Sequence, residues 1–181
     1  MPSTMSSPAS SRSNPRLFVA IPVVMERYPE IRERFGRFLE GRWTDTEQLH
    51  LTLAFLDRRF DADTAMRRLD RIAFRFEPVT LSHLGYFPRN RIFHAIAAHP
   101  SLRVLAADIV SAFDLPRADM VPHVTLMRVK ALHDADRFQA LLERYETHAL
   151  GALLPECRLY ESTLHRDGAR HTVLKSWSRI L

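Results

Sequence analysis

The sequence of 181 residues holds a single cysteine, Cys157, so no disulfide can form within the chain. It contains only five glycines and no glycine-rich loop that could bind nucleotide phosphates, which argues against an ATP-dependent reaction. A Gly-x-Ser-x-Gly elbow, a His-Glu-x-x-His motif and paired cysteines are absent, so neither a serine hydrolase nor a zinc enzyme is favoured. No run of about 18 apolar residues occurs, so we expect no membrane span and a cytoplasmic protein.

The sequence divides into a short polar tail and one longer globular region. Residues 1–14 are rich in serine and proline with almost no apolar side chains, so we expect a disordered tail there. The chain as a whole is 46% apolar and 26% charged, which is typical of a globular protein. We therefore expect residues 15–181 to form a single domain that acts as a monomer.

The net charge of +5 favours an anionic partner, such as nucleic acid or a phosphorylated small molecule. The basic residues are spread along the chain without a polybasic block. Charge alone is therefore weak evidence for a nucleic-acid substrate.

Helical and strand patterns alternate along the globular region, with hairpin-like strand pairs among them. This mixture predicts an α+β fold and argues against a doubly wound parallel sheet. Apolar residues at strand spacing predict strands at 17–21, 49–56, 79–86, 92–98, 123–129, 158–164 and 171–180. Apolar residues at helical spacing predict helices at 28–38, 61–72, 102–113 and 138–145.

The pattern His-x-Thr-x occurs in each half of the sequence, as His50-Leu51-Thr52-Leu53 and as His123-Val124-Thr125-Leu126. Both tetrads lie in predicted strands, where side chains two positions apart share a face. Each imidazole therefore lies beside a hydroxyl, while the two apolar residues anchor the opposite face. One such pair would often be structural, but two in equivalent strands favour a functional site. If a twofold relates the two halves, the imidazoles converge across one cleft.

This pair of tetrads suits the opening of a cyclic phosphate. The reaction needs a base that takes a proton from water and an acid that protonates the leaving ribose oxygen. Histidine fills either role near neutral pH, because its ordinary pKa is about 6.5. The hydroxyls of Thr52 and Thr125 can donate to the charge that develops on the phosphoryl oxygens. The scheme requires no metal and no cofactor.

At these tetrads the sequence closely resembles the 2H phosphoesterase superfamily, specifically the bacterial and archaeal 2′-5′ RNA ligase-like (LigT/ThpR) proteins. The resemblance runs from about Arg16 to the end of the chain. It rests on four blocks in the right order, which are RLFVAI at 16–21, LHLTLAFL at 49–56, PHVTLMR at 122–128 and LKSW at 174–177.

The resemblance implies a bilobal α+β fold, with two pseudo-symmetric lobes whose antiparallel sheets line a central cleft. It also implies hydrolysis of the 2′,3′-cyclic phosphate ends of RNA to 2′-phosphates, and some relatives reversibly join RNA ends through a 2′-5′ bond. His50 would be the proton donor to the departing 3′-oxygen, and His123 the proton acceptor that activates water. Arg128, with the two threonines, would bind the substrate phosphate.

Three positions complicate this picture. Strict alternation places Arg128 on the face opposite His123, so its side chain reaches the phosphate only if the strand ends or bulges after Leu126. Asp57 stands where the family usually has glycine. His171 stands where a tyrosine is common, so the contact with the nucleotide base could differ in this protein.

Two alternatives remain open from the sequence. The substrate could be a small cyclic nucleotide or an ADP-ribose cyclic phosphate instead of RNA. The chain could also be a nucleotide- or RNA-binding module without catalysis, although intact histidines in both tetrads speak against a pure binder.

Overall fold

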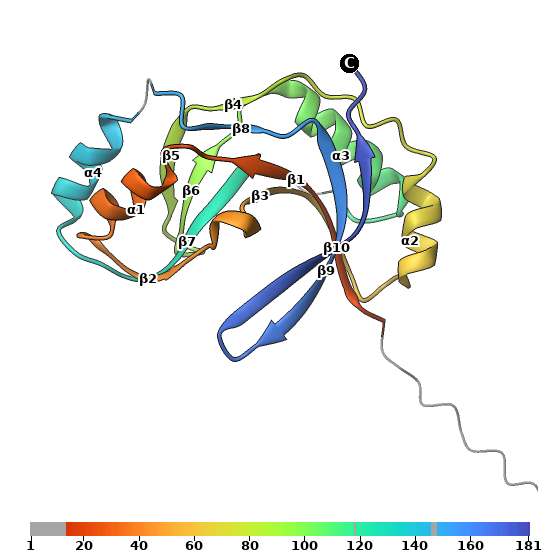
Figure 1. The fold of residues 1–181 in the computed structure, drawn as a ribbon, viewed down its shortest axis with the longest axis horizontal. Helices are drawn as coiled ribbons and strands as arrows, with labels where there is room; N and C mark the ends of the chain where they lie inside the picture. Colours follow the sequence, from red (N-terminus) through yellow and green to blue (C-terminus); the bar gives the residue numbers. More distant parts are fainter. Residues whose placement is uncertain (1–13, 118, 146–147) are drawn as a thin grey trace, which may run out of the picture.

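The structure is a computed structural model that describes residues 14–117, 119–145 and 148–181 (Figure 1). The tail predicted for residues 1–14 lies outside this part of the chain, except for Asn14, whose side-chain amide donates to the carbonyl oxygen of Arg58. The strands are β1 (Arg16–Val24), β2 (Leu39–Trp43), β3 (His50–Asp57), β4 (Thr80–Leu81), β5 (His83–Phe87), β6 (Ile92–Ile96), β7 (His123–Leu132), β8 (Gly151–Leu153), β9 (Glu156–His165) and β10 (Gly168–Ser178). The helices are α1 (Tyr28–Phe35), α2 (Ala62–Leu69), α3 (Pro100–Ala112) and α4 (Ala135–Glu143), with a 3-10 turn at Thr46–Gln48.

The named strands form one sheet in which every strand pair is antiparallel, so the predicted α+β class is confirmed. The main path runs β10-β9-β1-β3-β7-β6-β5. Outside this path, β2 pairs with β7, and β8 pairs with both β1 and β4. Strands β3 and β7, which carry the two tetrads, are therefore neighbours at the middle of the sheet.

The sheet and its helices group into two lobes on either side of the β3–β7 boundary. Helices α2 and α3 lie with β1, β3, β9 and β10, whereas α1 and α4 lie with β2, β5, β6 and β7 (Figure 1). The lobes do not coincide with the two halves of the sequence. Helix α1 directly follows β1 in the chain, yet its Phe35 ring packs on Phe93 of β6 and Phe138 of α4. None of the described helices is long and apolar enough to cross a membrane.

Strands β2 and β8 were not predicted, because neither shows an apolar alternation. In β2 the apolar Leu39 is buried while the next three residues are exposed, and β8 has three residues. Strand β1 also extends further than predicted, through Pro22 to Val24. The carbonyl oxygen of Pro22 accepts from the amide of Leu154, so the strand continues although proline has no amide to donate.

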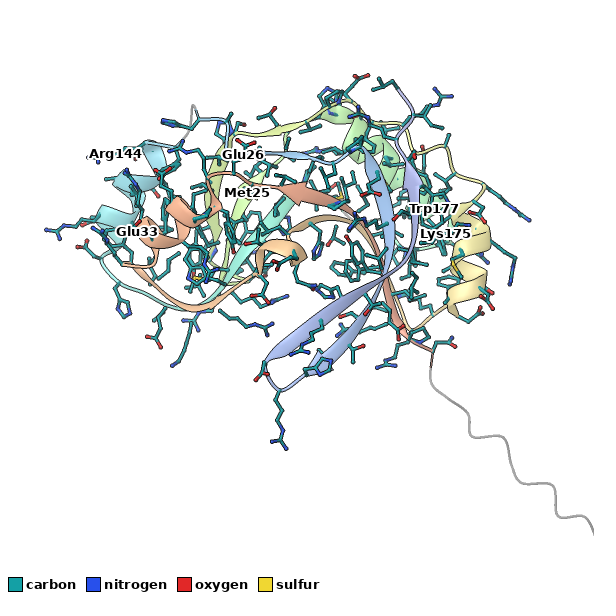
Figure 2. All side chains as sticks on the ribbon, in the orientation of Figure 1. Met25, Glu26, Glu33, Arg144, Lys175 and Trp177 are labelled. Carbon is teal, nitrogen blue, oxygen red and sulfur yellow. The ribbon has the colours of Figure 1, made fainter. Side chains whose placement is uncertain are left out.

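Helix α2 is fixed at both of its ends. Its predicted cap at Asp61 is confirmed, since the carboxylate accepts from the amide of Thr64 at 2.8 Å. Just past its last turn, Asp70 accepts from Lys175 Nζ at 2.6 Å and from Trp177 Nε1 at 2.8 Å. Figure 2 shows Lys175 and Trp177 projecting from β10 beside α2. These contacts fix the helix against the edge strand of its lobe.

Replacement of Phe35 by alanine tests the assignment of α1 to the lobe of β6 and α4. The Phe35 side chain is fully buried and lies 4.8 Å from the Phe93 ring, centroid to centroid. We expect Phe35→Ala to lower the free energy of unfolding by about 3–5 kcal/mol, because it leaves a cavity among aromatic rings. Urea denaturation measures this change. The matched control Val104→Ala, at an exposed position of α3, should change it by less than about 0.5 kcal/mol.

Candidate active site

The two tetrads meet where β3 and β7 pair. Leu51 and Val124 are antiparallel backbone partners, and both side chains are fully buried. An antiparallel register centred on this pair brings His50 opposite Thr125 and Thr52 opposite His123. Each imidazole therefore faces the hydroxyl of the other tetrad. The four polar side chains line one recess together.

Both tetrad histidines are held in the same orientation. His50 Nδ1 lies 2.6 Å from the carbonyl oxygen of Gln48, and His123 Nδ1 lies 2.8 Å from that of Val121. A carbonyl oxygen can only accept, so each Nδ1 carries the proton and donates it. The Nε2 atoms are left to exchange protons in the recess. Fixing one ring nitrogen in this way selects the tautomer that an acid–base catalyst needs.

A bulge in β7 turns Arg128 toward the recess. In the ladder with β6, Thr125 pairs with His94 and Met127 pairs with Phe93, so Leu126 between them has no partner. Leu126 and Met127 are consecutive buried residues, and the alternation of buried and exposed side chains shifts by one position. Arg128 consequently lies on the same side as His123 and lines the recess. The structure thus contains the bulge that the strand pattern required.

Strand β3 contains the corresponding bulge. Val19 of β1 pairs with Ala54 and Ala20 pairs with Thr52, so Leu53 has no partner in this ladder. The order of buried and exposed residues in β3 is the same as in the first eight residues of β7. Phe55 therefore occupies the position in β3 that Arg128 occupies in β7, and its side chain is 64% exposed. One strand presents an aromatic ring to the recess and the other presents a cation.

A second histidine and a phenylalanine surround His50. The ring centroid of Phe18 lies 5.1 Å from that of His50, and His171 approaches edge-on at 5.3 Å. Tyr160 stacks on Phe18 at 5.0 Å and lies 5.9 Å from the His50 ring. Burial lowers the pKa of His50 to about 4, and His171 acts in the same direction. His50 is therefore a neutral imidazole at pH 7 in the free protein.

His123 has a matching pair of neighbours from β5 and β6. Phe87 lies 5.2 Å from the His123 ring and His94 lies 5.7 Å from it, both edge-on. Phe87 also stacks on His94 at 3.8 Å. Burial lowers the pKa of His94 to about 4, so this second imidazole is neutral as well.

Gly85 leaves the space that His94 occupies. The two residues are cross-strand partners, and a Cβ atom on Gly85 would lie 2.7 Å from His94 Nε2. Any larger residue would push the ring away from its contacts with Phe87 and His123. His94 and Phe87 were not recognised in the sequence. The available signal was a polar residue, His94, inside the apolar run of β6.

The tetrads lie between two recesses of unequal size. The larger has a volume of about 1390 Å³ and extends toward α3, whereas the smaller has about 400 Å³ and extends toward the β9–β10 hairpin. His123 lines the larger recess and His171 the smaller one. Both recesses are lined by His50, Thr52, Phe55, Thr125 and Arg128.

No group of three or more histidine, cysteine, aspartate or glutamate side chains that could hold a metal ion occurs within residues 14–117, 119–145 and 148–181. Cys157 is fully buried, and burial raises the pKa of its thiol. A buried thiol of this kind is a poor nucleophile. At the tetrads the recess is lined by imidazole, hydroxyl and guanidinium groups.

Comparison with known proteins agrees with this geometry. The family described as LigT like Phosphoesterase matches residues 21–94, which include the first tetrad. The RNA 2′,3′-cyclic phosphodiesterase of Methanocaldococcus jannaschii is 24% identical over 90% of this chain and 99% of its own. The enzyme of the same name from Aquifex aeolicus is 26% identical over 82% of this chain and 89% of its own.

Solved structures extend the likeness to the second tetrad. Escherichia coli LigT in its apo form has a TM-score of 0.71 and 25% identity, covering 94% of this chain and 100% of that one. LigT complexed with 3′-AMP gives a TM-score of 0.71 with 26% identity, over 92% and 99% of the two chains. With both tetrads on adjoining strands of this shared fold, the chain is similar in sequence and in fold to the LigT-like phosphoesterases of the 2H superfamily.

Proposed function

We propose that the protein hydrolyses the 2′,3′-cyclic phosphate ends of RNA to 2′-phosphates. One observation carries this proposal: two imidazoles have their Nδ1 protons bound to carbonyl oxygens, which leaves both Nε2 atoms to one recess. The names of the two relatives, both RNA 2′,3′-cyclic phosphodiesterases, support the same substrate. We also propose that the protein acts as a monomer in the cytoplasm.

The proposed reaction is an in-line displacement at phosphorus. A water oxygen attacks the phosphorus atom while His123 Nε2 accepts the water proton. The bond from phosphorus to the 3′-oxygen breaks, and that oxygen takes the proton from His50 Nε2. Thr52 and Thr125 donate hydrogen bonds to the phosphoryl oxygens, and Arg128 balances their charge. The products are a 2′-phosphate and a 3′-hydroxyl, and a ribose hydroxyl in place of water would give a 2′-5′ linkage.

The proton on His50 must arrive with the substrate. Burial keeps this imidazole neutral at pH 7 in the free protein, because its pKa is lowered to about 4. The cyclic phosphate carries a negative charge, and an anion beside an imidazole favours the protonated form. Substrate binding and proton uptake by His50 are therefore coupled. An uncharged analogue would bind without converting His50 into an acid.

Product analysis in excess EDTA tests the proposal directly. We expect the purified protein to convert an oligonucleotide ending in a 2′,3′-cyclic phosphate into the 2′-phosphate product, because the proposed steps use no metal. Chromatography against authentic 2′- and 3′-phosphate standards measures the outcome. Complete loss of turnover on chelation would contradict the metal-free scheme, and a 3′-phosphate product would contradict the assigned leaving group.

Single and double replacement of the tetrad histidines tests their joint role. We expect His50→Ala and His123→Ala each to lower kcat by about 10²–10⁴-fold, the usual worth of a positioned proton transfer. The double variant should be little worse than either single one, because groups that act as one unit are not additive. His133→Ala, at a side chain that is 62% exposed, is the matched control and should keep full activity. Additive losses would indicate two independent roles.

The pH dependence of the rate follows from the pKa of His50. At low pH both imidazoles are protonated and no base remains, whereas at high pH neither can donate a proton, so the profile is bell-shaped. The profile of kcat/KM reports the free protein, and we expect its acidic limb near the lowered pKa of about 4. The acidic limb of kcat should lie at higher pH, because the bound phosphate favours the protonated ring. A profile with one limb would show that a single histidine titrates.

Circular dichroism at each pH separates this limb from acid unfolding. The pKa of His94 in the folded protein, about 4, is below its ordinary value of 6.5. The unfolded chain therefore binds this proton more readily, and stability falls as the pH decreases from 6.5 toward 4. An acidic limb that coincides with loss of the circular dichroism signal would report unfolding and not catalysis.

A further inference from the structure

The larger recess offers more room than one nucleotide needs. Its volume of about 1390 Å³ exceeds the roughly 300–1,000 Å³ of ordinary small-molecule sites. It runs from the tetrads to α3, where Arg103, Ala106, Ala107 and Val110 line it at the spacing of one helix face. The small alanine side chains leave the space above the helix open. A ligand that filled the whole recess would extend well beyond the cyclic phosphate.

The lining of this recess is strongly positive. Besides Arg128, four arginines line it, and each belongs to a different part of the chain: Arg59 after β3, Arg89 between β5 and β6, Arg103 on α3, and Arg117 before β7. Asp119 is the one carboxylate among the described residues that line it. The fold therefore gathers cations that are distant in the sequence around one cavity.

These four arginines have exposed side chains. None of them forms an ion pair with another residue in the described part of the chain. Some cations outside the recess are neutralised within the protein, as Arg68 is by Asp114 and Lys175 by Asp70. Guanidinium groups without carboxylate partners are suited to bind phosphates, and their planar fork matches two phosphate oxygens.

The smaller recess differs in charge. It is lined by Arg16 and Arg42 besides Arg128, against the two carboxylates of Asp45 and Asp57. Asp57 lies 3.6 Å from Arg16, so one of these cations is already paired. A polyanion would therefore enter the larger recess in preference to the smaller one.

From this asymmetry we infer that the larger recess binds the single-stranded RNA segment that precedes the cyclic phosphate, with Arg59, Arg89, Arg103 and Arg117 contacting its backbone phosphates. The inference rests on the proposed function and assigns the part of the site that holds the RNA chain ahead of its cyclic phosphate end. Leu115, Met120 and Val121, which follow α3 in the chain, line the same recess and offer an apolar surface to the bases.

The test compares a short RNA oligonucleotide ending in a 2′,3′-cyclic phosphate with the matching cyclic mononucleotide. For the double variant R103A/R117A we expect kcat/KM on the oligonucleotide to fall about tenfold or more, with no change on the mononucleotide. The slope of log kcat/KM against log salt concentration should become shallower by about 0.7 for each phosphate contact removed. Arg144→Ala is the matched control, since Arg144 is an exposed arginine just after α4 and outside the recess (Figure 2).

Equal losses on both substrates, or none on the oligonucleotide, would overturn the inference. A binding measurement keeps this result separate from failure of the proposed function. Fluorescence anisotropy with a labelled oligonucleotide ending in a 2′-phosphate requires no turnover, and R103A/R117A should weaken binding about tenfold or more. If the wild-type protein turns over neither substrate yet binds this probe through the two arginines, the function is wrong and the RNA site stands. If the wild-type protein fails to bind the probe, the RNA site is wrong.

Discussion

The pairing of Leu51 with Val124 joins the two lobes and sets the geometry of the site. Both side chains point into the core, where the surrounding apolar residues fix the position and the register of the two strands. Because side chains alternate along a strand, burying these two residues directs the imidazoles and hydroxyls on either side of them to the opposite face. A slip of one residue in this pairing would bury the tetrad histidines and threonines and expose the apolar residues. The core therefore determines the position of groups that lie outside it.

The residues around the two tetrads are arranged almost symmetrically. The proposed chemistry nevertheless requires a difference between the two sides, because one histidine acts as acid and the other as base. Both strands bulge one residue after their threonine, and both histidines have an edge-on histidine and a phenylalanine nearby. The difference arises at the position after the bulge, where β3 has Phe55 and β7 has Arg128. In the proposed mechanism, a cation on one side only gives the phosphate a preferred orientation. The two similarly placed imidazoles then take unequal roles as acid and base.

Features that depend on neighbouring residues could be predicted from the sequence. The tetrads, their strands and the helix cap at Asp61 depend on alternation or on contacts a few positions apart. The orientation of Arg128 could not be predicted, because the bulge at Leu126 depends on how β6 pairs with β7. The contacts of His94 and Phe87 with His123 could not be predicted for the same reason, because they join residues of three strands. The sequence also did not predict which elements form each lobe, because α1 packs away from the strand that precedes it.

The pairing of β1 with β9 has a consequence for how the protein is made. Phe18 beside His50 is the cross-strand partner of Tyr160, which lies near the other end of the chain. A ribosome that adds about 5–20 residues per second exposes β1 several seconds before β9 emerges to pair with it. During that interval the apolar β1 has an unpaired edge, which is the kind of edge that invites aggregation. We therefore expect activity to appear only with nearly full-length chains, and nascent or truncated chains to depend on chaperones.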